Sequence, residues 1–124
     1  MEYILENGLK LSRDVSGEWR IAGASQSFYL KGAEDFWRVV SLLEIPYKKA
    51  RSILGDEFAY PSVILAGLDS KSEYWIGLAL SWVGQGGFYA DRAVVIKLRE
   101  LIEADQLLQA DRGSVKSFIS KDVI

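Results

Sequence analysis

The chain has 124 residues, of which 49% are hydrophobic and 12% aromatic, and this composition is sufficient for the core of a single domain. A formal net charge of −2 and a pI of about 5.2 argue against a general affinity for nucleic acid or for anionic membranes. Histidine and cysteine are both absent, which excludes Ser-His-Asp and Cys-His catalysis, disulfide bonds and metal sites built on imidazole or thiolate. We therefore expect a protein that is not an enzyme and has no catalytic, cofactor-binding or metal-binding residue.

The apolar segments and the amino terminus predict a cytoplasmic location. The longest apolar stretch, from Tyr74 to Val83, is about half as long as the roughly 20 residues that a bilayer requires. The first ten residues, MEYILENGLK, carry acids where a signal peptide needs basic residues. We therefore expect no membrane partner and no export by a cleaved signal.

Residues 1–31 alternate between apolar and polar side chains, which is the period of a β-strand. The turn-forming sequences NG, DVSG and AGASQS divide this region into short segments. An antiparallel β-meander is the arrangement that these signals predict. Each strand contributes a pair of apolar residues to one face, namely Tyr3 and Leu5, Leu9 and Leu11, Trp19 and Ile21, and Phe28 and Leu30.

The apolar period changes to that of a helix from residue 33 onward. The apolar side chains of the first helix share one face: Phe36, Val40 and Leu43. A second, short helix should begin at Pro46 and end before Gly55, because proline favours the first turn and glycine the position after the last. The segment 61–68, PSVILAGL, fits either a helix or a buried strand by its periodicity, and we favour the helix.

The sequence SKSEYWIGLALSWVG predicts a buried helix that ends at Gly84. Ser72 is a good N-cap, and the apolar residues that follow point to all sides of a helix. A central strand is the alternative, which Gly77 would weaken. The glycines at 84, 86 and 87 lack the spacings of GxGxxG and of the P-loop, so we expect them to connect two helices without holding a phosphate.

A long amphipathic helix is predicted next, capped by Asp91 and extending to about Ala110. Its apolar stripe consists of Val94, Val95, Leu98, Leu101, Ile102 and Leu108. The tail at 112–124 fits a last short strand or helix. Together these elements predict one α+β domain over 1–124, in which a β-meander (1–31) packs against a mainly helical layer (33–110).

Two charged clusters invite functional interpretations that we do not favour. One consists of the carboxylates Glu100, Glu103 and Asp105, which could hold Mg²⁺ or Ca²⁺ but are typical of a solvated helix face. The other consists of the cations Lys48, Lys49 and Arg51, which follow a predicted helix as in a helix-turn-helix. Three cations in an acidic chain would bind nucleic acid only weakly, so we expect no nucleic-acid partner.

The segment 53–73 has the most uneven charge, −3, because it contains four acids and only one basic residue, a lysine. An acidic edge with aromatic side chains suits rapid association with a basic protein followed by anchoring. We therefore predict a partner-binding site made of Asp56, Glu57, Tyr60, Asp69 and Glu73, the alternative being that these acids only cap helices and line loops. The four tryptophans are expected to be mainly core residues, one of them partly exposed at an interface: Trp19, Trp37, Trp75 and Trp82.

The helical half, with SEYWIGLALSWV followed by DRAVVIKLRELIEA in a short acidic chain without Cys or His, resembles small bacterial immunity proteins. These include the immunity proteins of contact-dependent growth-inhibition toxins. The resemblance implies one-to-one neutralisation of a cognate toxin domain in the cytosol. It assigns no binding residue, because immunity proteins have many unrelated folds. A small-ligand-binding or carboxylate-dependent enzyme domain, with its cleft between sheet and helices, is the alternative, and a homo-oligomeric structural protein is a third.

Overall fold

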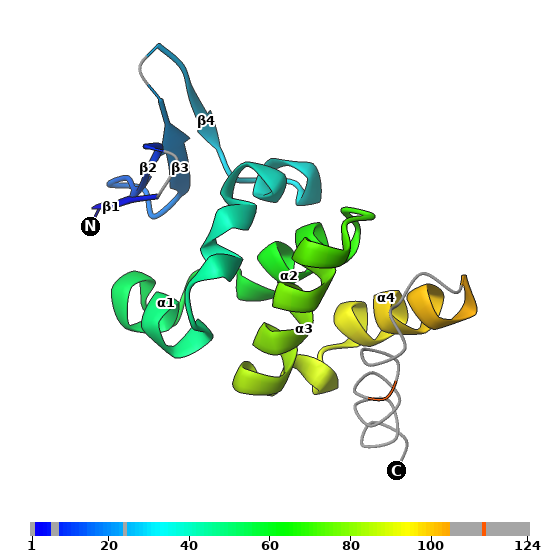
Figure 1. The fold of residues 1–124 in the computed structure, drawn as a ribbon. Helices are drawn as coiled ribbons and strands as arrows, with labels where there is room; N and C mark the ends of the chain where they lie inside the picture. Colours follow the sequence, from blue (N-terminus) through cyan, green and yellow to red (C-terminus); the bar gives the residue numbers. More distant parts are fainter. Residues whose placement is uncertain (1, 6–7, 24, 105–112, 114–124) are drawn as a thin grey trace.

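A computed structural model describes residues 2–5, 8–23, 25–104 and 113 of the chain. An antiparallel sheet of four strands lies at one end of the molecule, and the helices that follow it in sequence form the rest of the described fold (Figure 1). The predicted α+β architecture is therefore confirmed. Within the described ranges, every helix is too short or too polar to cross a bilayer.

The sheet is a meander with the strand order β1-β2-β3-β4, as the alternating sequence predicts. Between β2 and β3, the Asp14 carboxylate accepts hydrogen bonds from the Ser16 hydroxyl and from the backbone of Ser16 and Glu18, which lower its pKa. Leu11 and Ile21 are register partners and are both buried, so they fix the face of the sheet that joins the core. The strands are β1 (Glu2–Ile4), β2 (Lys10–Arg13), β3 (Trp19–Ala22) and β4 (Ser27–Tyr29).

The helices form where the sequence predicts them, although the first is a 3-10 helix. It contains one non-helical residue, Val39, at φ −116° and ψ 18°. At its start, the Asp35 carboxylate accepts hydrogen bonds from the backbone of Gly32 (3.0 Å) and Lys31 (3.1 Å). The helical segments are η1 (Ala33–Glu44), α1 (Tyr47–Leu54), α2 (Tyr60–Leu68), α3 (Glu73–Gly86), η2 (Phe88–Ala90) and α4 (Arg92–Glu103).

The predicted buried helix is α3, and the alternative of a central strand is wrong. The Ser72 hydroxyl accepts a hydrogen bond from the Trp75 backbone, as expected of an N-cap. The predicted end at Gly84 is corrected: the helix continues to Gly86, and Gly87 is the left-handed C-cap at φ 71°. Because Gly84 and Gly86 belong to the helix and only Gly87 follows it, the segment does not have the strand-loop-helix geometry of nucleotide-binding loops.

The last described helix, α4, begins at the predicted cap. The Asp91 carboxylate accepts a hydrogen bond of 3.1 Å from the Val94 backbone. The predicted continuation of this helix to Ala110, with Leu108 on its apolar stripe, lies outside the described residues. The predicted tail at 112–124 does so too, apart from Gly113.

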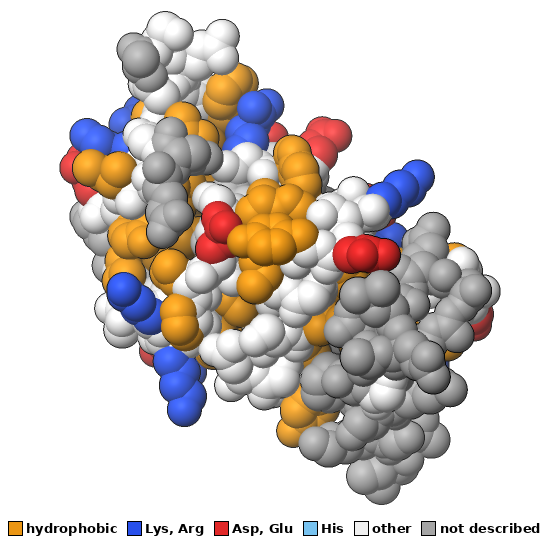
Figure 2. Space-filling model, viewed as in Figure 1, with side chains coloured by type: hydrophobic (Ala, Val, Ile, Leu, Met, Phe, Trp, Pro, Cys, Tyr) orange, Lys and Arg blue, Asp and Glu red, His pale blue; other side chains and the backbone are white. Residues whose placement is uncertain are grey.

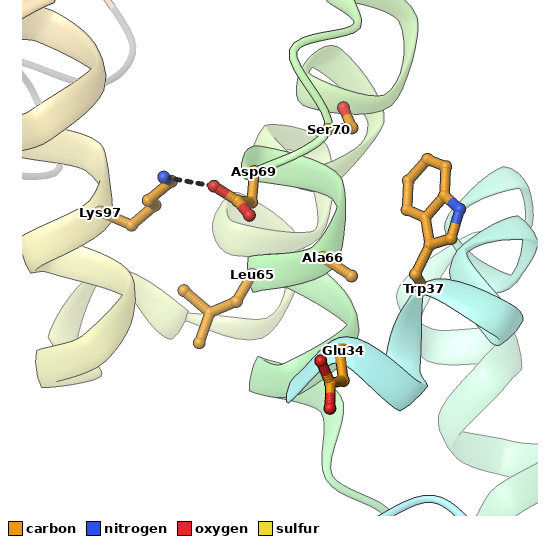
Figure 3. A pocket seen from close by; sticks show the side chains of 7 residues that line it. All are labelled: Glu34, Trp37, Leu65, Ala66, Asp69, Ser70 and Lys97. Atoms are coloured by element: carbon orange, nitrogen blue, oxygen red, sulfur yellow. Dashed lines mark hydrogen bonds and ion pairs between the residues drawn. The ribbon is translucent and has the colours of Figure 1, made fainter. Parts of the chain in front are cut away.

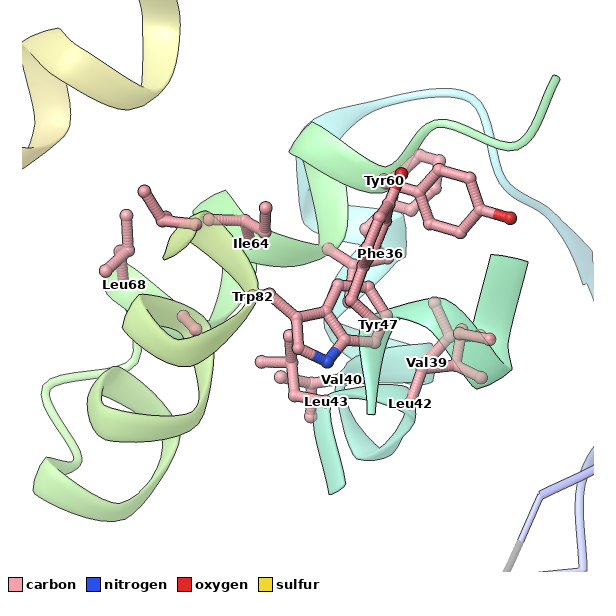
Figure 4. Packing of buried hydrophobic residues seen from close by; sticks show 14 of the residues in the cluster. Phe36, Val39, Val40, Leu42, Leu43, Tyr47, Tyr60, Ile64, Leu68 and Trp82 are labelled. Atoms are coloured by element: carbon pink, nitrogen blue, oxygen red, sulfur yellow. The ribbon is translucent and has the colours of Figure 1, made fainter. Parts of the chain in front are cut away.

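The core is centred on η1, α2 and α3, and it includes aromatic side chains from several helices (Figure 4). Trp82 of α3 is 1% exposed and lies against Tyr47 of α1, with ring centroids 5.6 Å apart. Gly67 allows α2 to approach both of its neighbours closely, because an added Cβ would lie 2.6 Å from the Leu43 side chain and 3.0 Å from Ala79. This packing fixes the relative positions of η1 and the α2–α3 turn, which carry the surface described next.

Candidate protein-binding surface

Tyr60 lies in the core and does not act as a surface anchor, so this part of the predicted partner site is wrong. The side chain is 3% exposed and packs against Tyr47 and Phe58, with centroid distances of 5.3 Å and 5.2 Å. Its hydroxyl donates a hydrogen bond to the backbone carbonyl of Gly55. Burial raises the pKa of Tyr60 to about 12. The phenol therefore closes the turn between α1 and α2.

The predicted acids at the start of α2 are both neutralised. Asp56 accepts a hydrogen bond of 2.8 Å from the Arg51 guanidinium. Glu57 forms an ion pair of 2.5 Å with Arg13, which connects the loop before α2 to strand β2. Both carboxylates are exposed, but each has a cation beside it, so their attraction for a basic partner is reduced.

The other two predicted acids lie at the opposite end of α2. Asp69 is the C-cap of that helix, and Glu73 opens α3. Because α2 has 9 residues, it separates the two pairs of acids by about 13 Å at a rise of ~1.5 Å per residue. The structure therefore does not combine the five predicted residues into one patch.

The α2–α3 end of the helical body carries a cluster of partly exposed aromatic side chains, which we call the aromatic face: Trp37, Tyr74 and Trp75. Trp37 is 48% exposed and Tyr74 is 56% exposed. Trp75 contacts both edge-on, with centroid distances of 6.3 Å to Trp37 and 5.0 Å to Tyr74. The Tyr74 hydroxyl donates a hydrogen bond of 2.5 Å to the Glu44 carboxylate. These contacts connect the three side chains into one cluster.

Acidic side chains surround the aromatic face. Glu34 and Glu44 belong to η1, while Asp69 and Glu73 flank the α2–α3 turn. Figure 2 shows hydrophobic side chains near the middle of this side of the molecule, over η1, with acidic side chains on either side. Lys71 lies in the same turn and adopts φ 61°, an uncommon conformation for a residue other than glycine.

A cavity of about 770 Å³ adjoins Trp37 (Figure 3). Its lining residues come from η1, α2, the turn after α2, and α4. The Lys97 ammonium lies 2.7 Å from Asp69 Oδ1 and 3.7 Å from Glu100 Oε2. The hydrogen bond to Asp69 raises the pKa of Lys97, so the ammonium is charged at neutral pH. The lining residues are Glu34, Trp37, Leu65, Ala66, Asp69, Ser70 and Lys97.

Sequence analysis expected one tryptophan to be partly exposed at an interface but did not identify Trp37, and of the acids around the face it named Asp69 and Glu73. One local signal does point to Trp37, because it lies outside the apolar stripe of Phe36, Val40 and Leu43 on the same helix. Glu34 is three residues before Trp37 and lines the same cavity. No comparable local signal links either residue to α2 or α4.

The described structure gives less support to the other candidate sites that the sequence suggested. A smaller cavity of about 310 Å³ between the sheet and η1 includes Arg38 but no carboxylate among its described lining residues, so it does not favour carboxylate chemistry there. Among the described residues, no group of three acids is placed to hold a metal ion; Asp105 lies outside them. Of the cations on α1, Arg51 is paired with Asp56, and Lys48 and Lys49 are exposed.

Comparison of the chain with known protein families, with characterised proteins and with solved structures gave no match. The geometry and charge of the aromatic face and its cavity are therefore the basis for assigning a function.

Proposed function

We propose that the protein is a stoichiometric protein-binding module of the immunity or antitoxin kind, which binds a basic toxin domain in the cytosol through the aromatic face. The observation that carries this proposal is the exposure of Trp37 and Tyr74 within an acidic surround. Tryptophan and tyrosine dominate binding energy at protein interfaces, since they bury large areas with few rotatable bonds. Surrounding acids increase the rate at which a basic partner associates.

The contacts within the face support a binding role. Trp75 supports Trp37 and Tyr74 from the side, and Glu44 holds the Tyr74 hydroxyl. Side chains that are already ordered lose less conformational entropy when a partner binds.

The chemistry available to the chain also favours inhibition by binding. A chain without His or Cys has neither the usual general base nor the usual strong nucleophile. An inhibitor that covers a toxin's active site or substrate surface needs neither. The resemblance of the helical half to immunity proteins agrees with this mode of action.

The direct test is to co-express the chain with the product of the gene immediately upstream, because an immunity gene ordinarily follows its toxin gene. We expect a 1:1 complex and protection of the host cell. Trp37→Ala should raise the Kd about 30-fold, as expected of a residue worth about 2 kcal/mol at the interface centre. Tyr29→Ala is the matched control, because Tyr29 is a 41% exposed aromatic residue on β4, in the sheet.

Two results would contradict the proposal in different ways. If no neighbouring product is toxic or bound, the immunity function is wrong. If a complex forms but Trp37→Ala and Tyr74→Ala bind as tightly as the wild type, the function stands and the assigned surface is wrong.

The cavity next to Trp37 favours a second candidate, the binding of a small ligand. Its volume of about 770 Å³ falls within the range of ~300–1,000 Å³ that is usual for small-molecule sites. A ligand that binds only the folded state must raise the melting temperature. A screen of metabolites by thermal shift, repeated with Trp37→Ala, would therefore detect this function independently of any protein partner.

A further inference from the structure

We infer that the cavity beside Trp37 receives an arginine side chain of the basic partner, an inference that rests on the function proposed above. Figure 3 shows Leu65 and Ala66 in the middle of the cavity, with Trp37 on one side and Lys97 on the other. Glu34 and Asp69 lie at opposite ends of this apolar floor. The cavity thus combines an apolar floor, an aromatic wall and two carboxylates.

The apolar part of the cavity suits a long aliphatic stem that carries a planar cation. Leu65 and Ala66 are only partly buried, and Trp37 keeps 48% of its surface exposed. The methylene groups of an arginine can pack on such a floor while its guanidinium stacks on the indole. The protein contains a similar pair elsewhere, with the Arg38 guanidinium carbon 3.8 Å from the centroid of the Phe28 ring.

The charge of the cavity selects a cation. Lys97 is shared between Asp69 and Glu100, at 2.7 Å and 3.7 Å, so two carboxylates compete for one ammonium. Glu34 forms no ion pair with another residue of the described part of the chain. Among the residues that line the cavity, two carboxylates and one ammonium leave a net charge of −1, and the Lys97 ammonium is further drawn on by Glu100. A guanidinium can donate two parallel hydrogen bonds to one carboxylate, a geometry that an ammonium does not offer.

The position of the cavity favours a side chain on a protein over a free small molecule. Trp37 belongs both to the cavity and to the aromatic face, so a partner that packs on the face brings its own side chains beside the cavity. The cavity also exceeds the volume of one side chain, which leaves room for neighbouring partner residues and for bridging water.

The test uses the free protein and a small probe, so it does not depend on finding the partner. N-acetyl-arginine N-methylamide is titrated into the full-length, ¹⁵N-labelled protein, and the Trp37 indole N–H signal is followed after assignment with Trp37→Phe. The corresponding citrulline derivative is the control, because its urea group has nearly the shape of guanidinium without the charge. We expect saturable shifts with the arginine probe only, with a Kd on the order of 10 mM for a side chain without its interface.

Variants test the role of the carboxylates. Glu34→Gln should weaken binding of the arginine probe at least threefold, whereas Asp56→Asn, which changes an acid outside the lining of this cavity, should leave it unchanged. The inference is overturned if the arginine probe causes no saturable shift, if citrulline binds equally well, or if Glu34→Gln has no effect. Nuclear Overhauser contacts between the Trp37 indole and residues 105–124 in the free protein would also overturn it, since the chain itself would then fill the cavity.

The two proposals can fail separately. If the arginine probe binds but no neighbouring gene product is toxic, the cation site is supported and the immunity function is wrong. If a toxin complex depends on Trp37 but has no arginine in the cavity, the immunity function is supported and the inference of an arginine site is wrong.

Discussion

The indole nitrogen of Trp82 donates a hydrogen bond of 2.9 Å to the backbone carbonyl of Ile45. This contact joins the middle of α3 to the connection between η1 and α1, where the residue before Pro46 has left the helical conformation. Because the helix does not continue past Ile45, no helical N–H is available to its carbonyl, and the Trp82 indole N–H takes that role. A single buried tryptophan thus connects two helices that are far apart in sequence.

Replacing this tryptophan should destabilise the protein more than replacing the exposed one. Trp82→Phe removes the donor from a buried carbonyl and leaves a cavity, so we expect a loss of about 2–4 kcal/mol in the free energy of unfolding. Trp37→Phe should change it by less than about 0.5 kcal/mol, because that side chain is half exposed. Urea unfolding followed by circular dichroism measures both values. Equal losses would show that Trp37 is a core residue, which would also weaken its assignment to a binding surface.

Two helical glycines should respond oppositely to substitution by alanine. At Gly67 an added methyl group would meet Leu43 at 2.6 Å and Ala79 at 3.0 Å, so Gly67→Ala should destabilise the protein by about 1–3 kcal/mol. At Gly77, in the middle of α3, an added Cβ meets nothing within 4 Å. Gly77→Ala should therefore stabilise the helix by roughly 0.5–1 kcal/mol. If the melting temperature falls for both variants, close packing at Gly67 is not the reason why Gly67→Ala destabilises the protein.

The start of η1 should give the protein a measurable sensitivity to acid. Hydrogen bonds from the backbone of Gly32 and Lys31 lower the pKa of Asp35 in the folded state. The unfolded value is about 3.9, so this contribution to stability is complete above about pH 4 and is lost as the pH falls through the lower, folded value. Asp35→Asn should lower the melting temperature at pH 7, and its difference from the wild type should shrink towards pH 2.

Glu34→Gln is the control for this prediction, because it removes a neighbouring charge from the first turn of η1 without removing these backbone hydrogen bonds. An equal effect of the two variants at each pH would show that the charge at the helix start is responsible, and not the capping interaction.

Local signals account for most of the fold that could be predicted. Ser72 and Asp91 cap their helices through the expected side-chain hydrogen bonds, and Gly55 follows α1 at φ 85°. The meander likewise follows from alternation and turn residues within short stretches. These interactions connect residues a few positions apart, so a single sequence contains the information that they require.

The arrangement of the exposed aromatic side chains depends on contacts between distant residues, which explains why sequence analysis placed Tyr60 at the surface. Tyr60 is buried because its ring meets Tyr47 and Phe58 and its hydroxyl reaches Gly55. The expectation that the tryptophans are mainly core residues holds only for Trp82, because Trp19 and Trp75 are partly buried and Trp37 is 48% exposed. The pair between Arg13 and Glu57 spans 44 positions, and no local pattern shows that it neutralises a predicted site residue.

Acids beside the aromatic face and acids in the loop before α2 should contribute differently to partner association. Glu34→Gln with Glu73→Gln removes two charges of the first group, while Asp56→Asn with Glu57→Gln removes the two carboxylates of the loop, which pair with Arg51 and Arg13. We expect the first double variant to associate with the basic partner about tenfold more slowly at low salt. The second changes the net charge equally but should slow association less, because its charges lie farther from the aromatic face. The difference should decrease at high salt, because screening at 1 M reduces the Debye length to about 3 Å. Stopped-flow association rates at two salt concentrations measure it, and a larger effect of the second double variant would place the binding surface beside Asp56 and Glu57.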